Sequence, residues 1–297
     1  MNILVTGGTG FIGTQVATRL IAGGHQVRVL SRGTKPTVSG AQWVRGSVLE
    51  EGTLAEALHG CDAVVHLVGI ISEIGSQTFE RMHIEATAKV VSAMRQNGVN
   101  RLVHMSALGA RSNAPSRYHR TKAAAEALVR EGGLAWTIFR PSLVYGRGDG
   151  FVTLFDRISR WSPIIPVFGS GTNQLQPLPV RTVAEAFSRA LENIGTVSQI
   201  VDLVGPQPLS FREILRTLLL VRGRRRWLVS VPMPLARLQA RLLETIFPTV
   251  FGAAPPLNRD QLLMLQEDNV GDPQQAERLM GISTVSFKQG LQGMFFD

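Results

Sequence analysis

The stretch ILVTGGTGFIGTQVATRL, which begins at Ile3, constrains the fold more than any other part of the chain. Its short apolar run predicts a strand, and the apolar spacing after the glycines predicts a helix. Between them lie two nested patterns, Gly7-x-x-Gly10-x-x-Gly13 and Gly8-x-Gly10-x-x-Gly13. Such glycines permit a tight turn, a close approach of the backbone to a pyrophosphate, and close packing of the helix on the strand. The stretch therefore predicts a dinucleotide-binding loop, with the helix N-terminus facing the phosphates.

Predicted strands and helices alternate along the first half of the chain, which is typical of an α/β fold with a doubly wound parallel sheet of the Rossmann type. Later the pattern loosens, because prolines cluster between 163 and 179 and helices dominate. We therefore predict a dinucleotide-binding domain over 1–148 and a smaller, mostly helical substrate or partner-docking region over 149–297. A strand near 199–204 is expected to return to the main sheet.

The composition is that of an ordinary globular protein. The 297 residues are 44% hydrophobic, which is enough for a sizeable core. Cys61 is the single cysteine, so a disulfide framework and a Cys-based metal site are excluded. The histidines show no metal-ligand spacing, and we predict no metal. No apolar run approaches the ~18 residues of a membrane span, so we expect a cytoplasmic protein, either free or peripheral on the inner face of the cytoplasmic membrane.

The end of the second predicted strand indicates which dinucleotide is bound. In NAD-binding proteins an acidic residue about 20 residues after the glycines holds the ribose 2′-hydroxyl. Here Ser31 and Arg32 stand at that place, with Lys35 close behind. A guanidinium can pair with a 2′-phosphate through two hydrogen bonds, whereas a carboxylate would repel it. The sequence therefore favours NADP(H) over NAD(H), with a surface arginine as the alternative reading of Arg32.

Three residues predict acid–base chemistry beside the cofactor. Tyr118 and Lys122 are four apart on a predicted helix, so they share one face. Ser106 ends the strand that precedes this helix. A nearby ammonium favours the phenolate, so we expect Lys122 to lower the pKa of Tyr118 from its usual value of about 10. Tyr118 would then exchange a proton with a carbonyl or alcohol whose oxygen Ser106 holds.

The residues TGGTGFIG, Ser106, YHRTK and FRPSLVYGRGD resemble the short-chain dehydrogenase/reductases, in the extended or atypical branch with nucleotide-sugar epimerases and dehydratases. The motifs HLVGI, HIEAT, VHMSALGA and PPLNRDQLLMLQEDNV are closest to bacterial relatives of the NADPH-binding accessory subunit of respiratory complex I. This resemblance implies a tightly held NADPH and a location at the membrane-facing side of complex I.

The resemblance also implies roles for individual residues. It places at the pyrophosphate Gly7, Thr9, Gly10, Phe11, Ile12 and Gly13. It places around the adenine, its ribose and the 2′-phosphate Ser31, Arg32, Ser47, Val48, Leu67, Val68 and Gly69. At the nicotinamide it places Tyr118, Lys122, Pro141 and Val144.

Some positions depart from the branch that the chain resembles. Ser47 stands where many relatives have Asp, and His83 stands where extended members usually have Asn. Arg181 and Thr182 replace a pair in which an acidic residue is common. These changes leave nucleotide binding intact as a prediction but weaken the interpretation as an ordinary nucleotide-sugar epimerase.

The segment 222–251 is basic and amphipathic. Arginines at 222, 224, 225 and 226 precede Trp227, a pattern that serves anionic headgroups, an acidic protein face or a solvated surface. Further along, the leucines at 235, 238 and 242 and the isoleucine at 246 form one apolar helical face. Such a face more often packs in a core or between domains than on a membrane, and we expect core packing. The alternative is docking to complex I or to an anionic membrane surface.

Taken together, these patterns predict an NADP(H)-binding short-chain dehydrogenase/reductase that transfers hydride at a carbonyl or alcohol, associated with respiratory complex I or with quinone metabolism. One alternative is a nucleotide-sugar epimerase or dehydratase. Another is a non-catalytic subunit that the cofactor stabilises. The formal net charge of +9 does not indicate nucleic-acid binding, because the chain carries no recognisable nucleic-acid module. The identity of the small-molecule substrate is not encoded in these motifs.

Overall fold

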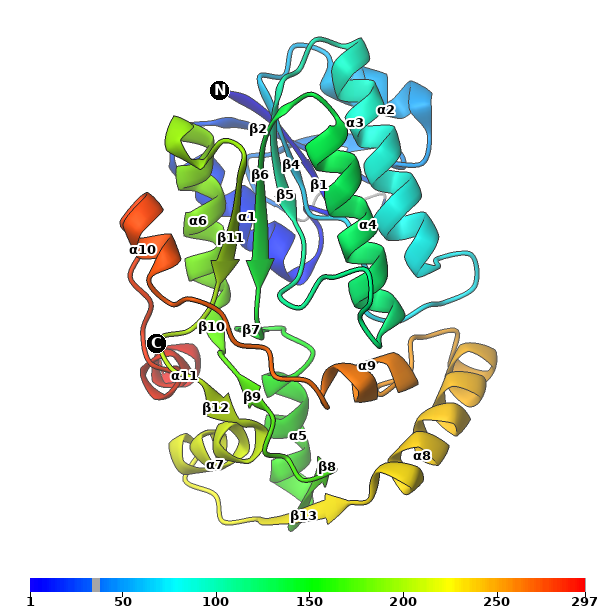
Figure 1. Cartoon of the computed structure of the whole chain (residues 1–297), viewed down its shortest axis with the longest axis vertical. Helices are drawn as coiled ribbons and strands as arrows, with labels where there is room; N and C mark the ends of the chain where they lie inside the picture. The colour runs from blue at the N-terminus through cyan, green and yellow to red at the C-terminus, as the bar shows by residue number, and fades with distance from the viewer. Residues whose placement is uncertain (34–37, 297) are drawn as a thin grey trace.

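A seven-stranded parallel sheet forms the centre of the computed structural model, which describes residues 1–33 and 38–296 (Figure 1). Lys35 lies outside the described residues. From one edge to the other the strands are β11 (Gln199–Leu203), β6 (Ala135–Pro141), β5 (Arg101–Met105), β4 (Ala63–His66), β1 (Asn2–Thr6), β2 (Gln26–Ser31) and β3 (Gln42–Arg45). Each strand pairs in parallel with its neighbour. The predicted α/β, doubly wound Rossmann fold is confirmed.

Two hydrophobic cores lie on the two faces of the sheet, because successive side chains of a strand point to opposite faces. Ile3 and Val5 of β1 pack in one core, and Leu4 packs in the other. All three side chains are fully buried. The central strands are therefore apolar on both faces, as a sheet covered by helices on each side requires.

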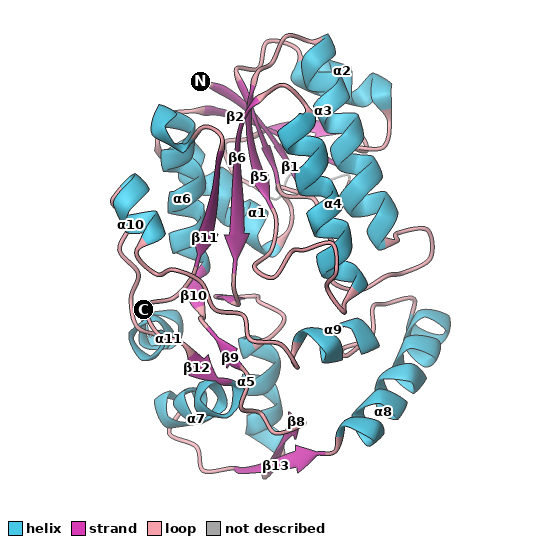
Figure 2. Cartoon of the chain, viewed as in Figure 1, coloured by secondary structure: helices cyan, strands magenta, loops and turns pink. Residues whose placement is uncertain are grey.

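Helices cover both faces of the sheet (Figure 2). The first half of the chain contributes α1 (Phe11–Ala22), α2 (Glu51–Leu58), the π-helical segment η1 (Glu80–Glu85), α3 (Ala86–Gln96) and α4 (Arg117–Glu131). The core on one face includes residues of α1 and α6 (Val180–Glu192), and the other core includes residues of α2, α3 and α4. Figure 1 shows these two groups on opposite sides of the sheet.

Most of the rest of the second half forms a smaller body beyond the carboxyl ends of the strands (Figure 1). Its helical elements are α5 (Val152–Trp161), α7 (Phe211–Val221), α8 (Met233–Ile246), η3 (Phe247–Phe251), α9 (Arg259–Met264) and α11 (Phe287–Phe296). Its short strands pair as β7 (Val144–Tyr145) with β10 (Leu178–Pro179), β9 (Gln174–Leu175) with β12 (Leu209–Ser210), and β8 (Ile164–Phe168) with β13 (Trp227–Val231). The short helix η2 (Ile194–Thr196) instead directly precedes β11, and α10 (Gln275–Met280) packs in the same core as α1 and α6.

Strand β11 joins this second half to the main sheet, because it pairs with β6 at the sheet edge. The division of the chain into domains at 148 stays a prediction. Among the described residues, no helix is both long enough and apolar enough to cross a membrane.

Two helices begin close to the loops that are predicted to bind the nucleotide. Helix α1 begins at Phe11, directly after the last turn of the glycine loop. Helix α2 begins at Glu51, and Thr53 lies inside it, where its hydroxyl donates to the carbonyl oxygens of Ser47 and Glu50. A threonine hydroxyl can bond backward within a helix as well as cap it, and Thr53 does the former.

Helix α1 lies so close to the glycine loop that position 13 has no room for a side chain, which can be tested. A Cβ atom added there would lie 2.1 Å from the carbonyl oxygen of Gly7, which is backbone and cannot move aside easily. We expect Gly13→Ala to lower the free energy of unfolding by about 3 kcal/mol or more. Gly52→Ala is the control, because a Cβ there meets nothing within 4 Å, and alanine favours the helix by roughly 1 kcal/mol. Equal denaturant midpoints for the two variants would contradict this reading.

Candidate cofactor-binding and catalytic site

A cavity of about 530 Å³ opens at the carboxyl ends of β1, β4, β5 and β6. This is the edge at which open parallel sheets bind their ligands. Most of the residues predicted from the sequence line it: Gly7, Gly10, Phe11, Ile12, Gly13, Leu67, Gly69, Ser106, Tyr118, Lys122, Pro141 and Val144. The same cavity is lined by apolar residues that the sequence did not single out: Ile70, Ile71, Ile74, Met105, Ala107 and Ala254.

The glycine loop leaves room for a ligand because side chains are excluded at its critical positions. Gly7 has φ +75°, and a Cβ there would lie 2.9 Å from the backbone of Leu67 and Val68. Gly10 caps α1 without a side-chain hydrogen bond, and a Cβ there would approach protein atoms no closer than 3.4 Å. The first N–H groups of α1 therefore face the cavity with no side chain to satisfy them, which suits an anionic pyrophosphate.

Gly8 has a different role from its neighbours. It is buried, and a Cβ there would lie 2.9 Å from the side chain of Val29 on β2. The position accordingly requires glycine for packing between β1 and β2.

A second cavity, of about 600 Å³, adjoins the first through Gln77, which lines both. Its lining includes the exposed arginines Arg32, Arg45 and Arg81 and the predicted Ser47. The guanidinium of Arg32 donates to Oε1 of Gln77 at 3.2 Å. Glu50 also lines this hollow, but the three guanidinium groups outnumber its one carboxylate, and together they can attract a strongly charged anion such as a phosphate.

Arg45 and Arg81 were not predicted as site residues. Arg45 ends β3 and pairs in register with Ser31 of β2, so the sheet brings it beside Arg32. Arg81 lies on η1, and its guanidinium donates to the carbonyl oxygen of Ser76 at 3.0 Å. The arginine after the third predicted strand was a visible signal for Arg45, whereas nothing in the sequence placed Arg81 nearby.

Four predicted residues do not line either cavity. Thr9 is exposed at the tip of the loop. The hydroxyl of Ser31 accepts a hydrogen bond from the amide of Gly33 at 3.1 Å. Val48 and Val68 pack in the hydrophobic core that also contains Leu4. Their predicted contacts with a nucleotide are therefore not seen in these two cavities.

The three predicted catalytic residues meet in the first cavity. Lys122 is buried, and its ammonium donates to the carbonyl oxygen of Met105 at 2.7 Å. Ser106 follows Met105 at the end of β5, and its buried hydroxyl has no hydrogen-bond partner. Tyr118 lies half-buried one turn before Lys122 on α4. An unpaired buried hydroxyl beside a phenol and an ammonium fits a site that awaits a polar ligand atom.

The expected effect of Lys122 on Tyr118 is wrong in this structure. Burial raises the pKa of Tyr118 to about 12, so the phenol stays protonated at neutral pH. Burial also lowers the pKa of Lys122 to about 8, since the charged form loses its hydration. The ammonium is committed to the Met105 carbonyl, and desolvation outweighs any attraction between the two groups. Without a ligand, Tyr118 is arranged as a proton donor.

His83, the departure from the usual asparagine, positions the catalytic helix. Nε2 of His83 lies 3.1 Å from both the amide nitrogen and the carbonyl oxygen of Ile70, and Nδ1 lies 2.8 Å from the Thr121 hydroxyl. Thr121 lies on α4 between Tyr118 and Lys122, and the His83 ring packs edge-on against Tyr118. Burial and the nearby Lys122 lower the pKa of His83 to about 2, so the ring stays neutral.

Asp260 ties the second half of the chain to the same helix. Its carboxylate accepts from the amides of Arg117 and Tyr118, at 2.9 and 2.7 Å. A carboxylate at a helix N-terminus satisfies free N–H groups and interacts favourably with the helix dipole. The sequence contained no signal for this contact, because 142 residues separate Asp260 from Tyr118.

The predicted core packing of the segment 222–251 is wrong for its leucine face. The side chains of Leu235, Leu238, Leu242 and Ile246 are all exposed. Part of the basic cluster is instead internal: Arg222 and Arg224 both bind the carboxylate of Asp156.

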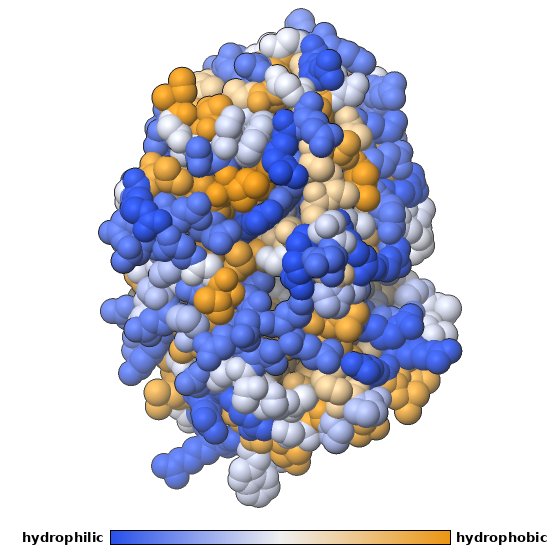
Figure 3. Space-filling view, in the orientation of Figure 1, coloured by the Kyte–Doolittle hydropathy of each residue, from blue (hydrophilic) through white to orange (hydrophobic). Residues whose placement is uncertain are grey.

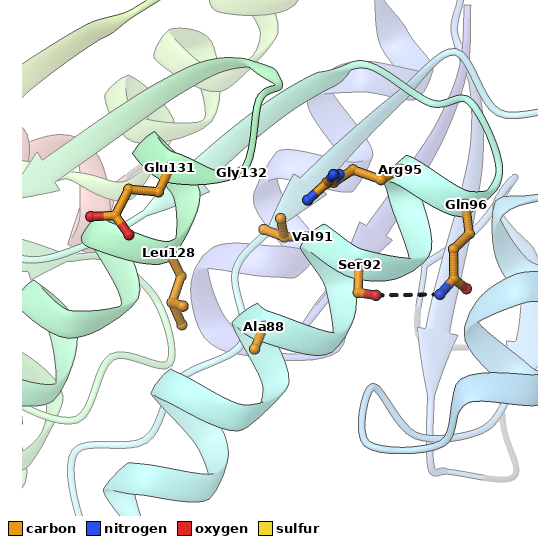
Figure 4. A pocket seen from close by; sticks show the side chains of 8 residues that line it. All are labelled: Ala88, Val91, Ser92, Arg95, Gln96, Leu128, Glu131 and Gly132. Atoms are coloured by element: carbon orange, nitrogen blue, oxygen red, sulfur yellow. Dashed lines mark hydrogen bonds between the residues drawn. The ribbon is translucent and has the colours of Figure 1, made fainter.

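A further depression, of about 590 Å³, lies between α3 and α4 (Figure 4). Arg95 and Glu131 are its charged lining residues, and Ser92 accepts a hydrogen bond from Gln96 at 3.4 Å. None of the predicted catalytic residues lines it. It carries no arrangement for chemistry, so the cavity at the glycine loop is the candidate active site.

Comparisons with known proteins show which proteins the chain is similar to. Residues 3–201 match the NAD dependent epimerase/dehydratase family. The chain is 27% identical to a 4-hydroxy-2-methyl-3-oxo-4-farnesyl-3,4-dihydroquinoline-1-oxide ketoreductase from Stigmatella aurantiaca, over 99% of this chain and 96% of that protein. It is 28% identical to the mitochondrial NADH dehydrogenase (ubiquinone) 1 alpha subcomplex subunit 9 of Arabidopsis thaliana, over 80% of this chain and 61% of that protein.

Among solved structures, the fold is similar to that of a UDP-glucose 4-epimerase from Thermotoga maritima. The TM-score is 0.77, and the alignment covers 99% of this chain and 97% of the epimerase. At 22% sequence identity this likeness concerns the fold.

The burial of Lys122 predicts a pH dependence of stability. Its pKa in the folded state, about 8, lies below the 10.5 of a free lysine, so between these values the unfolded chain binds more protons. Stability should therefore rise with pH from 8 to 10. Lys122→Met should remove this rise and raise the free energy of unfolding at pH 7 by about 1–3 kcal/mol, since losing the Met105 hydrogen bond offsets part of the gain.

The measurement is urea unfolding at pH 7, 8, 9 and 10. Lys89→Met is the matched control, because its ammonium lies near the surface beside Glu51 at 3.3 Å. A constant stability difference between wild type and Lys122→Met across pH 8–10 would contradict the buried charge.

Proposed function

The chain belongs to the NAD dependent epimerase/dehydratase family, and we propose that it is an NADP(H)-dependent oxidoreductase that reduces a carbonyl group on an apolar substrate. One observation carries this proposal: Ser106, Tyr118 and Lys122 meet in a cavity that adjoins a hollow with three arginines. The Ser106, Tyr118 and Lys122 side chains support proton transfer at a carbonyl. The arginines of the hollow support a cofactor that carries a 2′-phosphate, which distinguishes NADP(H) from NAD(H).

The residues present fit the pyrophosphate, the 2′-phosphate and the nicotinamide ribose of NADP(H). The glycine loop and the first N–H groups of α1 would hold the pyrophosphate. Arg32, Arg45 and Arg81 would pair with the 2′-phosphate, and Lys122 would reach the nicotinamide ribose. When bound, NADPH supplies the hydride.

The side chains of the site would handle the substrate oxygen and its proton. The unpaired hydroxyl of Ser106 would donate to the carbonyl oxygen and hold it near Tyr118. Because the pKa of Tyr118 is raised to about 12, its phenol carries the proton that the reduced oxygen needs. The Lys122 ammonium would then stabilise the phenolate left behind.

The walls of the cavity support an apolar substrate. Apart from Lys122, no charged residue appears among the described residues that line it. A nucleotide sugar brings two phosphates that need cationic partners, so this lining does not favour the epimerase alternative. The ketoreductase from Stigmatella aurantiaca, by its name, acts on a ketone that carries a farnesyl chain.

A second candidate is a cofactor-holding subunit that associates with respiratory complex I, at the membrane, without turnover. The similarity to the mitochondrial subunit from Arabidopsis thaliana supports it. The unpaired Ser106 hydroxyl and the protonated phenol are not required by a purely structural cofactor, and they favour the reductase. Substrate-dependent oxidation of NADPH separates the two candidates.

Substitution of Tyr118 tests the chemistry. We expect Tyr118→Phe to lower kcat for NADPH oxidation by about 10²–10⁴-fold, because the proton donor is lost, while NADPH binding persists. Suitable substrates are a long-chain 3-oxo acid ester and a prenylated quinone, with UDP-glucose as the epimerase probe. Tyr145→Phe is the matched control, because that buried hydroxyl has no partner and lies outside the cavity. Unchanged kcat in Tyr118→Phe would refute the assignment.

The arginine hollow makes a separate prediction about the cofactor. Arg32→Ala should weaken NADPH binding by about 10- to 100-fold, since a charge-assisted pair contributes roughly 1.5–3 kcal/mol. NADH binding should hardly change, because NADH lacks the 2′-phosphate. Arg32→Ala combined with Arg45→Ala should remove the preference, and Arg95→Ala on α3 serves as the control. Titration of cofactor fluorescence measures each affinity, and tighter binding of NADH than NADPH by the wild type would contradict the proposal.

A further inference from the structure

Large apolar side chains form a continuous exposed face on α8 and η3. This apolar ridge consists of Leu235, Leu238, Leu242, Ile246, Val250 and Phe251. Their exposed fractions lie between 45% and 66%, and their spacing of three or four residues places most of them on one side of the helix. A surface helix normally turns such residues toward the core. In α8 the large apolar side chains face outward instead.

The opposite side of α8 packs against the protein through small residues. Ala236 and Ala240 are fully buried and pack in a small cluster with Leu262 of α9. Small residues let α8 lie close against the protein, and the large residues are left pointing outward. Helix α8 stands at the periphery of the molecule in Figure 1, and Figure 3 shows hydrophobic patches among hydrophilic side chains at this lower right edge.

Arginines flank the apolar ridge. The segment 222–251 contains six arginines and one acidic residue, Glu244, and two of these arginines, Arg222 and Arg224, are bound to Asp156. The carboxylate of Glu244 is engaged by Arg259 at 2.7 Å. Arg237 and Arg241 are exposed on α8 itself. An apolar face flanked by arginines complements a surface that combines hydrocarbon with negative charge.

Two tryptophans extend this surface along the same end of the molecule. Trp161, at the end of α5, is 87% exposed, and Trp227, at the start of β13, is 74% exposed. Trp227 pairs in register with Ile164 of β8, which is also exposed, and β13 leads directly into α8. Tryptophan favours the boundary between water and lipid, where its ring and its N–H group both find partners.

The apolar ridge ends at the mouth of the candidate active site. Phe251 stands three residues before Ala254, an exposed residue that lines the cavity. On the other side of the mouth, Ile71 is 54% exposed, and its carbonyl oxygen accepts from the side-chain Nδ2 of Asn258 at 2.9 Å. Three residues of chain span at most about 11 Å, so the ridge and the mouth are adjacent.

We propose that the apolar ridge docks on an anionic lipid bilayer and brings the mouth of the cavity to the bilayer surface. A bilayer offers hydrocarbon for the six apolar side chains and negative headgroups for Arg237 and Arg241. The ridge lies at the edge of the molecule, a position that suits a broad, deformable surface. This inference goes beyond the reductase function, because docking is measured without turnover.

Vesicle flotation of the full chain tests the proposal. The wild type should float with vesicles of phosphatidylcholine and phosphatidylglycerol, and binding should weaken in 0.5 M salt, at a Debye length of about 4–5 Å. Leu238→Gln with Leu242→Gln should reduce binding by about tenfold or more. Arg237→Gln with Arg241→Gln should reduce binding to phosphatidylglycerol vesicles by about 10- to 30-fold. Pure phosphatidylcholine should bind weakly.

Matched controls separate the ridge from general hydrophobicity. Leu220→Gln and Ile194→Gln remove exposed apolar side chains outside the ridge and should leave vesicle binding unchanged. All variants lie at the surface, and unfolding midpoints should confirm that each is folded. NADPH affinity should stay at the wild-type value, so failure of docking and failure of the proposed activity are distinguishable.

Three results would overturn the proposal. The first is absence of binding to vesicles of any composition. The second is equal binding by wild type and the leucine variant. The third is a dimer in solution that the leucine variant converts to a monomer, because the ridge would then be the contact between two copies of this chain.

Discussion

The buried ammonium of Lys122 is the interaction around which the site is arranged. Taking an ammonium out of water is costly, and here the carbonyl oxygen of Met105 is its hydrogen-bond partner. This positive charge also affects the protonation state of the neighbouring histidines. The pKa values of His66 and His83 fall to about 3 and 2, mainly through burial and also through this charge. The histidines near Lys122 are therefore neutral, and its charge is available to a substrate or cofactor.

The neutral histidines serve as rigid supports. His66 is fully buried, and its ring nitrogens contact the hydroxyls of Thr6 at 2.6 Å and Thr87 at 3.1 Å. His83 connects the loop after β4 to Thr121 of α4. The His66 contacts join β4 to β1 and α3, whereas His83 and the carboxylate of Asp260 hold α4 from the loop after β4 and from α9. Two parts of the chain that are distant in sequence thus set the position of Tyr118.

The sequence correctly predicted features that are formed by residues close together along the chain. The strand, glycines and helix at the N-terminus are consecutive, and the four-residue spacing of Tyr118 and Lys122 is a helical property. The role of Arg45 required the pairing of β3 with β2, and that of Asp260 required a contact across 142 residues. The sign of the pKa shift of Tyr118 depended on burial, which spacing does not reveal. The leucines of α8 were misjudged because Ala236 and Ala240 were the residues that packed.

The exposed leucines and the apolar cavity lining both bear on how an apolar substrate would reach the candidate active site. An apolar carbonyl compound dissolves poorly in water, so it is concentrated in lipid, and an enzyme that meets it only in solution would be limited by supply. The apolar ridge lies at the periphery of the molecule and ends three residues before Ala254, which lines the candidate active site together with the exposed Ile71. At the far end, the arginines lie in a separate hollow, where a water-soluble cofactor can bind without crossing that surface. The two ligands would therefore approach from different directions and meet beside Ser106 and Tyr118.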